Sequence, residues 1–230
     1  MMRIAVLASG KGSNFRVIAE HVRAGRIPVD LSLLLCNKPD APALDIAREF
    51  GVPTWSRSHR DFASREAFDA AMLNAMRDAG VEAVVLAGYM RLLSTEFVRT
   101  YAGKIINLHP SLLPAFAGTN GGADALAYGV KLTGCTVHFV VDDMDAGAVI
   151  IQAALPVAEN DTEESLMPRV HALEHRIFPQ ALAWLAQDRL RQEGRVVRLL
   201  PAPGRDTPNR AALAPVPGGC LIHPPLEAGF

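Results

Sequence analysis

Residues 3–15 read RIAVLASGKGSNF, a short apolar run that passes through two glycines into the start of a helical pattern. A strand that leads through a glycine-rich turn into a helix is the opening unit of an α/β fold. Further apolar runs of strand length alternate with segments of helical periodicity. These runs are residues 31–35, 83–87, 104–108, 135–141 and 149–155. The alternation predicts an α/β fold, with a mostly parallel twisted sheet and helices on both faces.

The carboxyl-terminal part of the chain has two segments of different composition. A long helix is predicted after Thr162, a good N-cap residue, and extends to about Asp188. Beyond Gly194 the sequence is rich in proline and glycine, because seven of the 16 prolines lie after residue 200. We therefore expect one domain over residues 1–193 and a Pro/Gly-rich C-terminal tail over residues 194–230 that is pinned against the body or a neighbouring subunit.

Charge and cysteine content limit the partners. Lys and Arg number 23 against 24 Asp and Glu, so the whole chain has no field that would attract nucleic acid or an anionic membrane. The three cysteines have neither a CxxC spacing nor an even count, which argues against disulfides and a structural zinc site. The first apolar run is too short to span a bilayer and lacks a signal-peptide cleavage pattern. A cytoplasmic location is expected, and the sequence leaves a homodimer open.

The loop after the first strand predicts an anion site. Its backbone N–H groups and the positive end of the following helix dipole converge at Gly12, Ser13 and Asn14. The third glycine of a dinucleotide fingerprint is replaced by Phe15, and no Walker lysine follows. A single phosphate on a small substrate is therefore favoured over a pyrophosphate. The alternative is a tight strand-to-helix turn in which Ser13 is only the N-cap.

The strand at residues 104–108 carries the second polar group. Asn107 and His109 alternate there and should share one face of the strand, so they form a candidate oxyanion site. An acidic loop, DDMDAG at residues 142–147, follows the next apolar run. One of its three carboxylates could face His109 and favour its protonated form. The alternatives are a structural histidine and an ordinary aspartate turn.

Other chemistries find less support. Ser111 lies outside a nucleophile elbow and Cys135 lies inside an apolar strand, so no covalent nucleophile is evident. No metal is expected, because His109 and His138 lack partners at ligand spacing. We interpret His171 and His175 as part of a packed or solvated helix face and not as metal ligands. What remains is direct acyl transfer to an amine without a covalent intermediate.

Four segments together resemble a known family. They are ASGKGSN at the start, LAGYMRLLS from Leu86, INLHPSLLPAFAG from Ile106 and GCTVHFVVDDMDAGAVIIQ from Gly134. Their order and spacing resemble the folate-dependent formyltransferase family, and within it the phosphoribosylglycinamide formyltransferase branch, over about residues 1–190. The resemblance implies a Rossmann-like catalytic domain over residues 1–193. It also implies formyl transfer from 10-formyltetrahydrofolate to the amine of 5-phosphoribosylglycinamide in purine biosynthesis.

The resemblance also implies roles for individual residues. Asn107 and His109 would stabilise and protonate the oxyanion, and Asp145 would raise the pKa of the histidine. Gly12, Ser13 and Asn14 would bind the substrate phosphate, with Glu174 on the ribose side. Folate contacts would come from Arg65, Met90, Arg91, Leu92, Leu93 and Asn107. From the residues alone, Leu92 and Leu93 are predicted to be core and Arg65 an exposed helix charge.

One segment departs from the family pattern. In Gly118-Thr119-Asn120-Gly121-Gly122-Ala123-Asp124, three small residues and an aspartate replace the bulk and positive charge that the family often has there. The departure bears on the flexibility of this loop and on the affinity for the phosphorylated substrate. The alternative functions are a hydrolase that releases formate, whose relatives carry an extra N-terminal domain, and transfer to methionyl-tRNA, which needs a basic C-terminal domain. A phosphate-sensing binding module without turnover is the alternative from another class.

Overall fold

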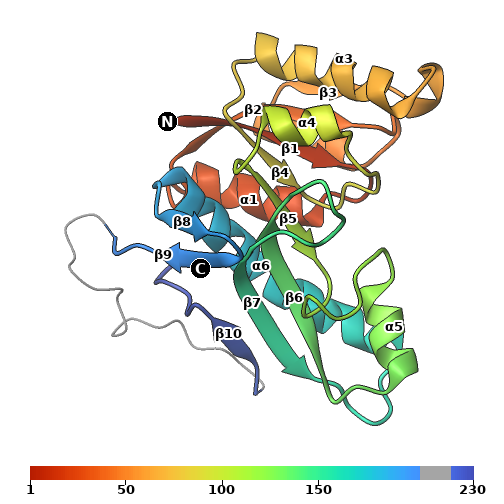
Figure 1. Ribbon diagram of the computed structural model, residues 1–230, viewed down its shortest axis with the longest axis vertical. Helices are drawn as coiled ribbons and strands as arrows, with labels where there is room; N and C mark the ends of the chain where they lie inside the picture. Colours follow the sequence, from red (N-terminus) through yellow and green to blue (C-terminus); the bar gives the residue numbers. More distant parts are fainter. Residues whose placement is uncertain (203–218) are drawn as a thin grey trace. The chain divides into compact units, whose positions relative to one another are not determined.

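The computed structural model describes residues 1–202 and 219–230 (Figure 1). The chain forms two compact units, which are described separately. The first unit comprises Met1–Asn107 with Val140–Asp142, and the second comprises Leu108–Phe139 with the chain from Asp143 onward. No helix among the described residues has both the length and the apolar character needed to cross a membrane.

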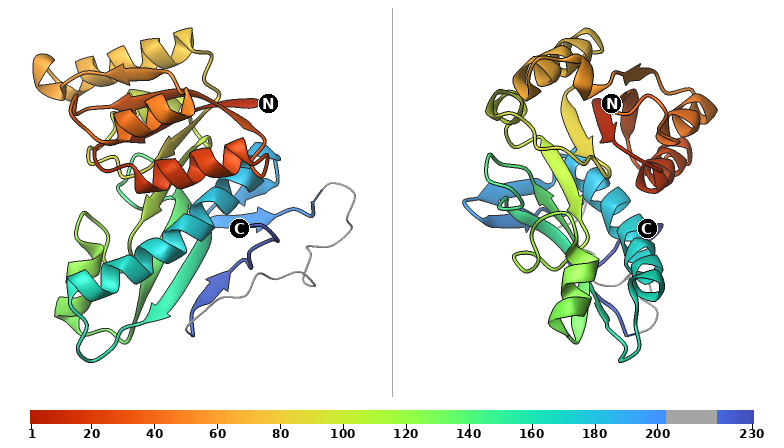
Figure 2. Two further views of the ribbon diagram at one scale, coloured as in Figure 1. Left: turned by 180° about the vertical axis from the view of Figure 1, so that it is seen from behind. Right: turned by 90° about the vertical axis from the view of Figure 1, so that its right-hand side faces the viewer.

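The first unit is a parallel sheet with crossover helices. Its strands are β1 (Met2–Ala8), β2 (Val29–Cys36), β3 (Thr54–Ser56), β4 (Ala83–Leu86) and the beginning of β5 (Ile105–His109). Its helices are α1 (Ser13–Arg23), α2 (Ala43–Phe50), α3 (Arg65–Asp78), α4 (Thr95–Thr100) and the 3-10 turn His59–Asp61. The strands pair in the order β3-β2-β1-β4-β5, all parallel. Figure 2 shows α1 and α2 on one face of this sheet and α3 and α4 on the other.

Apolar residues from both the strands and the helices fill the core of the first unit. Phe68 of α3 is fully buried against the aromatic rings of Trp55 and Phe62, at centroid distances of 5.6 and 5.1 Å. Leu7 and Val84, from neighbouring strands, belong to the same buried cluster. Because strands buried on both faces need continuous apolar runs, the uninterrupted runs in the sequence are explained by this packing.

The second unit is built mainly from antiparallel strands. Its elements are α5 (Gly121–Tyr128), β6 (Leu132–Phe139), β7 (Val149–Pro156), α6 (Glu163–Ala186), β8 (Leu190–Glu193), β9 (Val196–Leu199) and β10 (Leu221–His223). β6 and β10 both pair antiparallel with β7, and β8 pairs antiparallel with β9, whereas β7 and β9 are parallel. Helix α6 packs on β6 and β7. Thr162 is its N-cap and forms a reciprocal capping box with Ser165, as its residue type predicts.

The α/β fold class with a mostly parallel sheet and helices on both faces is confirmed. The antiparallel pairing of β6 with β7 is a difference in detail. Residues 140–148 between them are too few for a crossover helix, so the chain must reverse direction. β9 and β10 lie within the segment predicted as a tail, and a domain boundary between residues 193 and 194 stays a prediction.

Candidate active site

The glycine-rich loop of the first unit joins β1 to α1 with little space around Gly12. This residue is the N-cap of α1 and has the left-handed backbone angles φ 76 and ψ 22. A Cβ atom placed on it would lie 2.8 Å from the Cβ of Ala43, so only glycine fits both the angle and the contact. Ser13 is therefore the first helical residue and not the N-cap, which corrects the alternative considered from the sequence.

The start of α1 offers what an anion needs. The first N–H groups of a helix have no partners within the helix, and the first turn of α1 contains no acidic residue. Ser13 is exposed, so a ligand can reach its side chain, and Asn14 is half-buried. Because the loop follows the carboxyl end of a buried strand, it lies where open α/β sheets bind ligands.

A second loop follows β4 at the same edge of the parallel sheet. It includes Met90 and Leu92, whose exposed fractions are 64% and 57%. Leu93 packs against the core of the unit, so the core prediction holds for Leu93 and is wrong for Leu92. Arg91 lies with its guanidinium carbon 5.7 Å from the centre of the Phe68 ring. The structure thus presents two large apolar side chains to solvent beside the glycine-rich loop.

The two loops of the first unit are joined directly. The backbone N–H of Ser9 donates to the carbonyl of Gly88 at 3.1 Å, and the Ser9 hydroxyl accepts the N–H of Met90 at 2.9 Å.

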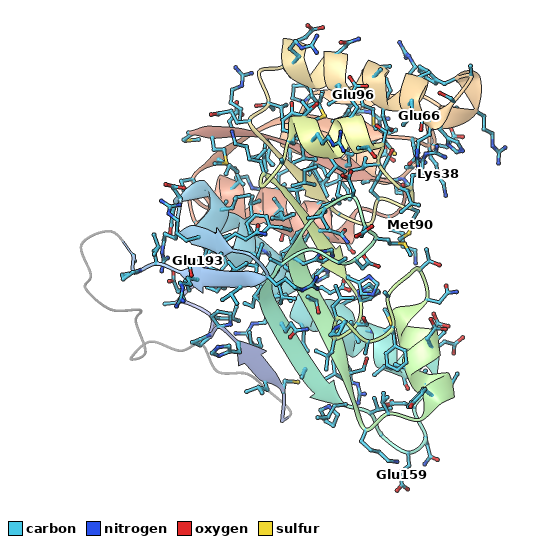
Figure 3. All side chains as sticks on the ribbon, viewed as in Figure 1. Lys38, Glu66, Met90, Glu96, Glu159 and Glu193 are labelled. Atoms are coloured by element: carbon cyan, nitrogen blue, oxygen red, sulfur yellow. The ribbon has the colours of Figure 1, made fainter. Side chains whose placement is uncertain are left out.

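Arg65 begins α3, is exposed, and forms an ion pair with Glu66 at 3.1 Å, which agrees with its prediction as an exposed helix charge. Figure 3 shows Lys38, Glu66 and Met90 on one side of this unit.

Strand β5 supplies the polar pair predicted from the sequence. Asn107 pairs with Leu86 in the parallel register of the first unit and is half-buried. His109 ends the strand, belongs to the second unit, and has an exposed fraction of 3%. The two residues are two positions apart on one strand, so their side chains leave the same face.

His109 is placed between two hydrogen-bond acceptors of the second unit. Its Nε2 lies 2.9 Å from the carbonyl oxygen of Phe116, and its Nδ1 lies 3.4 Å from Oδ2 of Asp145. A carbonyl oxygen can only accept, so Nε2 carries a proton. A doubly protonated imidazole offers a donor to each acceptor, whereas a neutral one offers only one. The imidazole is thus held between a backbone carbonyl oxygen and a carboxylate oxygen, and Nε2 donates to the first of them.

Asp145 is fixed in its position by backbone and side-chain contacts. Its Oδ2 accepts the N–H of Gly118 at 2.9 Å, and its φ angle of 53° lies in the left-handed region. Gly147, two residues on, could not be another residue, because a Cβ there would overlap the carbonyl oxygen of Phe139 at 1.6 Å. Asp142 of the same acidic loop belongs to the first unit and lies 3.9 Å from Arg99.

A second histidine faces the same carboxylate and was not predicted as a site residue. His138 is buried, with its Nε2 3.7 Å from Oδ1 of Asp145 and its Nδ1 2.9 Å from the carbonyl of Phe139. The pKa of His138 is lowered, chiefly because the side chain is buried and in smaller part because His109 is near. The Phe139 carbonyl and the Asp145 carboxylate act in the opposite direction and raise it. In the sequence it is a lone histidine inside an apolar strand, which is the pattern of a core residue.

The loop between His109 and α5 is held by buried polar groups that the sequence pattern does not reveal. The Thr136 hydroxyl accepts the N–H of Leu113 at 3.1 Å and donates to the carbonyl of Ser111 at 2.7 Å. The side-chain amide of Gln152 donates to the carbonyl of Leu113 at 2.9 Å and to Thr136 at 3.0 Å. These bonds fix the chain that follows His109 against β6 and β7.

The segment that departs from the family pattern contains the beginning of a helix. Gly121 and Gly122 are buried and form the first turn of α5. A Cβ on Gly121 would lie 2.8 Å from the carbonyl of Pro110, and one on Gly122 would lie 2.5 Å from the sulfur of Met167. The small residues therefore let α5 pack closely on its neighbours, which is a packing role that their composition does not indicate.

Helix α6 places Glu174 in the second unit, nine-tenths or more buried. Its Oε2 lies 2.9 Å from Nδ1 of His171, so the histidine at position 171 pairs with this carboxylate along the helix. The described residues contain no group of three or more histidines, cysteines or acids arranged to hold a metal ion.

Comparison with known proteins gives consistent matches. Residues 2–182 match the formyl transferase family. Phosphoribosylglycinamide formyltransferase of Bacillus subtilis (strain 168) is 40% identical over 185 residues, which are 80% of this chain and 95% of that protein. Trifunctional purine biosynthetic protein adenosine-3 of Drosophila melanogaster is 46% identical over 185 residues, and the match spans 80% of this chain but 14% of that longer protein.

A solved structure extends the match to three dimensions. Glycinamide ribonucleotide transformylase 1 from Symbiobacterium toebii has a TM-score of 0.86 at 46% identity, with 87% of this chain and 95% of that chain covered. The family match over residues 2–182 includes every site residue predicted from the sequence.

Proposed function

The chain belongs to the formyl transferase family, and we propose that it transfers the formyl group of 10-formyltetrahydrofolate to the amine of 5-phosphoribosylglycinamide in de novo purine (IMP) biosynthesis. The observation that carries this proposal is His109, which lies between the Phe116 carbonyl and the Asp145 carboxylate. The names of the relatives from Bacillus subtilis and Symbiobacterium toebii support the choice of acceptor.

The chemistry requires an acid and an oxyanion site but no covalent intermediate. The amine nitrogen attacks the formyl carbon, and the carbonyl oxygen becomes an oxyanion. Asn107 would donate a hydrogen bond to this oxygen, and His109 would donate its proton. As the carbonyl re-forms, its oxygen returns the proton to His109 and the carbon–nitrogen bond to folate breaks. The leaving nitrogen takes up the proton that the amine gives up. Asp145 would hold the imidazole protonated between turnovers.

The proposal assigns the two substrates to features of the first unit and of α6. The phosphate would bind to the N–H groups of Gly12, Ser13 and Asn14, for which a helix N-terminus without acidic residues is suited. Glu174 would bind the ribose side. Folate would contact the exposed apolar side chains of the loop after β4. The assigned folate residues are Arg65, Met90, Arg91, Leu92, Leu93 and Asn107.

The proposal includes a reducing cytoplasmic location, since Cys36, Cys135 and Cys220 are all free thiols. Both substrates are small molecules, and no metal ion takes part in the proposed reaction.

One assay separates this function from a hydrolase and from a binding module. Purified chain is given 10-formyltetrahydrofolate with and without 5-phosphoribosylglycinamide, and tetrahydrofolate release and the formylated ribonucleotide are measured. A transferase releases tetrahydrofolate only with the acceptor, in equal amounts to the formylated product. Release of formate without the acceptor would identify a hydrolase, and the absence of turnover would favour a binding module.

A further inference from the structure

A buried carboxylate outside the proposed chemistry ties two segments of the first unit together. Asp69, in the second turn of α3, has an exposed fraction of 1%, and its Oδ2 accepts the N–H of Ser94 at 2.6 Å. Ser94 in turn caps α4, because its hydroxyl accepts the N–H of Phe97 at 3.3 Å. Burial of a carboxylate is costly, and here it fixes the end of the loop that follows β4.

The groups around the Asp69 carboxylate shift its pKa in opposite directions, and one of its oxygens lacks a hydrogen bond. Burial raises the pKa of Asp69, while the N–H and hydroxyl of Ser94 and the guanidinium groups of Arg65 and Arg91 lower it. Its second oxygen, Oδ1, is buried and has no hydrogen-bond partner among the described residues. A core residue of the same size without charge would avoid this cost, so stability alone does not account for an aspartate at this position.

The other end of the loop has a buried polar anchor of its own. The hydroxyl of Ser9 accepts the N–H of Met90 at 2.9 Å and donates to Oδ1 of Asn37 at 2.6 Å. Ser9 and Asn37 are both buried, so water does not compete for these bonds. The loop is thus fixed near Met90 and again at Ser94, and only a short segment lies between the two anchors.

That segment exposes apolar surface. Met90 and Leu92 are 64% and 57% exposed, and Figure 3 shows the Met90 side chain standing away from the ribbon. Anchoring at both ends reduces the conformational entropy that the segment would otherwise lose on binding a ligand. Two exposed apolar side chains on a fixed backbone are suited to packing against the flat face of a ring system.

We propose that Asp69 is a positioning residue for the folate co-substrate, and that it and the Ser9–Asn37 pair hold residues 90–93 in the conformation that binds the folate ring. This inference rests on the proposed function. Asp69 acts through the N–H of Ser94 and has no contact with the reacting atoms. It should therefore affect folate affinity and leave the chemical step and the ribonucleotide site unchanged.

The test compares two substitutions at Asp69 with a control on the same helix. Asp69→Ala should raise the KM for 10-formyltetrahydrofolate and the Kd for tetrahydrofolate about tenfold, with kcat and the ribonucleotide KM within about twofold of the parent. Asp69→Asn keeps an oxygen that accepts the Ser94 N–H and should restore both folate values to within about threefold. Asp78→Ala, at the exposed end of α3, should change none of them.

The outcomes against the proposal are defined in advance. It is overturned if a folded Asp69→Ala protein, checked by circular dichroism, binds tetrahydrofolate with parental affinity, or if kcat and both KM values worsen together. If Asp69→Ala does not fold, Ser9→Ala removes the other anchor without touching α3. Unchanged tetrahydrofolate affinity in a folded Ser9→Ala protein then also overturns it. Tetrahydrofolate binding is measured by calorimetry, so the result does not depend on whether the parent chain transfers a formyl group.

Discussion

At the scale of single residues, the feature that sets His109 apart is that both of its ring nitrogens face acceptors. The acceptors come from Phe116 and Asp145, and both of these non-glycine residues have a φ angle of 53°. A left-handed conformation costs a residue with a side chain about 1–2 kcal/mol. The second unit therefore tolerates backbone strain at two positions that share one imidazole, which is typical of a functional site.

Removing the charge of Asp145 should change how turnover depends on pH. In Asp145→Asn one of the two acceptors facing His109 is neutral, so the protonated imidazole is less favoured. We expect kcat to fall by about 10- to 100-fold, the alkaline loss of kcat to begin at lower pH, and tetrahydrofolate affinity to stay within about threefold. The measurement is kcat against pH for both proteins. An alkaline limb at the same pH would argue against the pairing.

His138 should make the free energy of unfolding decrease as the solution becomes acidic. Burial lowers its pKa below the ordinary value of 6.5, so below that pH the unfolded chain binds a proton that the native chain does not. Its contribution to stability is present above pH 6.5 and is lost as the pH falls through the lowered value. In His138→Asn the unfolding free energy should vary less with pH in this window, by at most about 1.4 kcal/mol per pH unit.

Urea unfolding at a series of pH values measures this difference. His223→Asn, at an exposed position of β10, is the control and should keep the parental slope. If the two variants have equal slopes, His138 is not the group responsible.

At the scale of elements, the glycine-rich loop depends on one glycine much more than on the other. Gly12→Ala combines a left-handed φ with an overlap against Ala43, whereas a Cβ on Gly10 would meet nothing within 4 Å. We expect Gly12→Ala to lower the unfolding free energy by about 1–3 kcal/mol and to raise the ribonucleotide KM at least tenfold. Gly10→Ala should stay within about 0.5 kcal/mol of the parent. Equal effects of the two substitutions on KM would contradict the close packing at Gly12.

The strands show which elements a sequence can reveal. Most strands buried in the sheet have continuous apolar runs, such as residues 83–87, and their predicted ends lie within two residues of the observed ones. The exception is β6, which begins three residues before the predicted run at 135–141. The short strands β3, β8, β9 and β10 were not predicted, because three or four residues with exposed positions carry no periodicity of their own. The direction of β7 follows from the length of the connection before it, which composition does not indicate.

The same distinction applies to the site residues. Asn107 and His109 could be proposed because polar residues interrupt an apolar strand at its carboxyl end. The acidic loop pointed to one of three carboxylates, and the family resemblance selected Asp145 among them. His138 and Thr136 lie within a buried strand, and nothing in the sequence distinguishes them from core residues. Asp69 lies on a helix that reads as amphipathic, so its bond to Ser94 is visible only in three dimensions.

At the scale of the whole molecule, the last described residues are bound to the second unit by a buried arginine. Arg189 is 3% exposed and donates to both carboxylate oxygens of Glu227, at 3.2 and 2.8 Å, and to the carbonyl of Leu200. Leu226 is buried, and the N–H of Glu227 donates to Gln180 of α6 at 2.8 Å. The expectation that the tail is pinned is thus confirmed for residues 219–230, whereas residues 203–218 lie outside the described part.

Two arginines in this region allow a matched comparison. Arg189→Ala removes hydrogen bonds to charged and backbone acceptors and should lower the unfolding free energy by about 1.5–3 kcal/mol. Arg191→Ala removes an exposed ion pair with Asp188 and should cost less than about 0.5 kcal/mol. Both values come from urea unfolding. A loss of similar size in the two variants would show that residues 219–230 add little to stability.

The most direct test of the central claim is the turnover of His109→Ala beside its affinity for tetrahydrofolate. If His109 is the acid of a formyl transferase, this variant should transfer the formyl group to 5-phosphoribosylglycinamide at least about 100-fold more slowly, while its Kd for tetrahydrofolate stays within about threefold. Parental turnover in a folded His109→Ala protein would contradict the account.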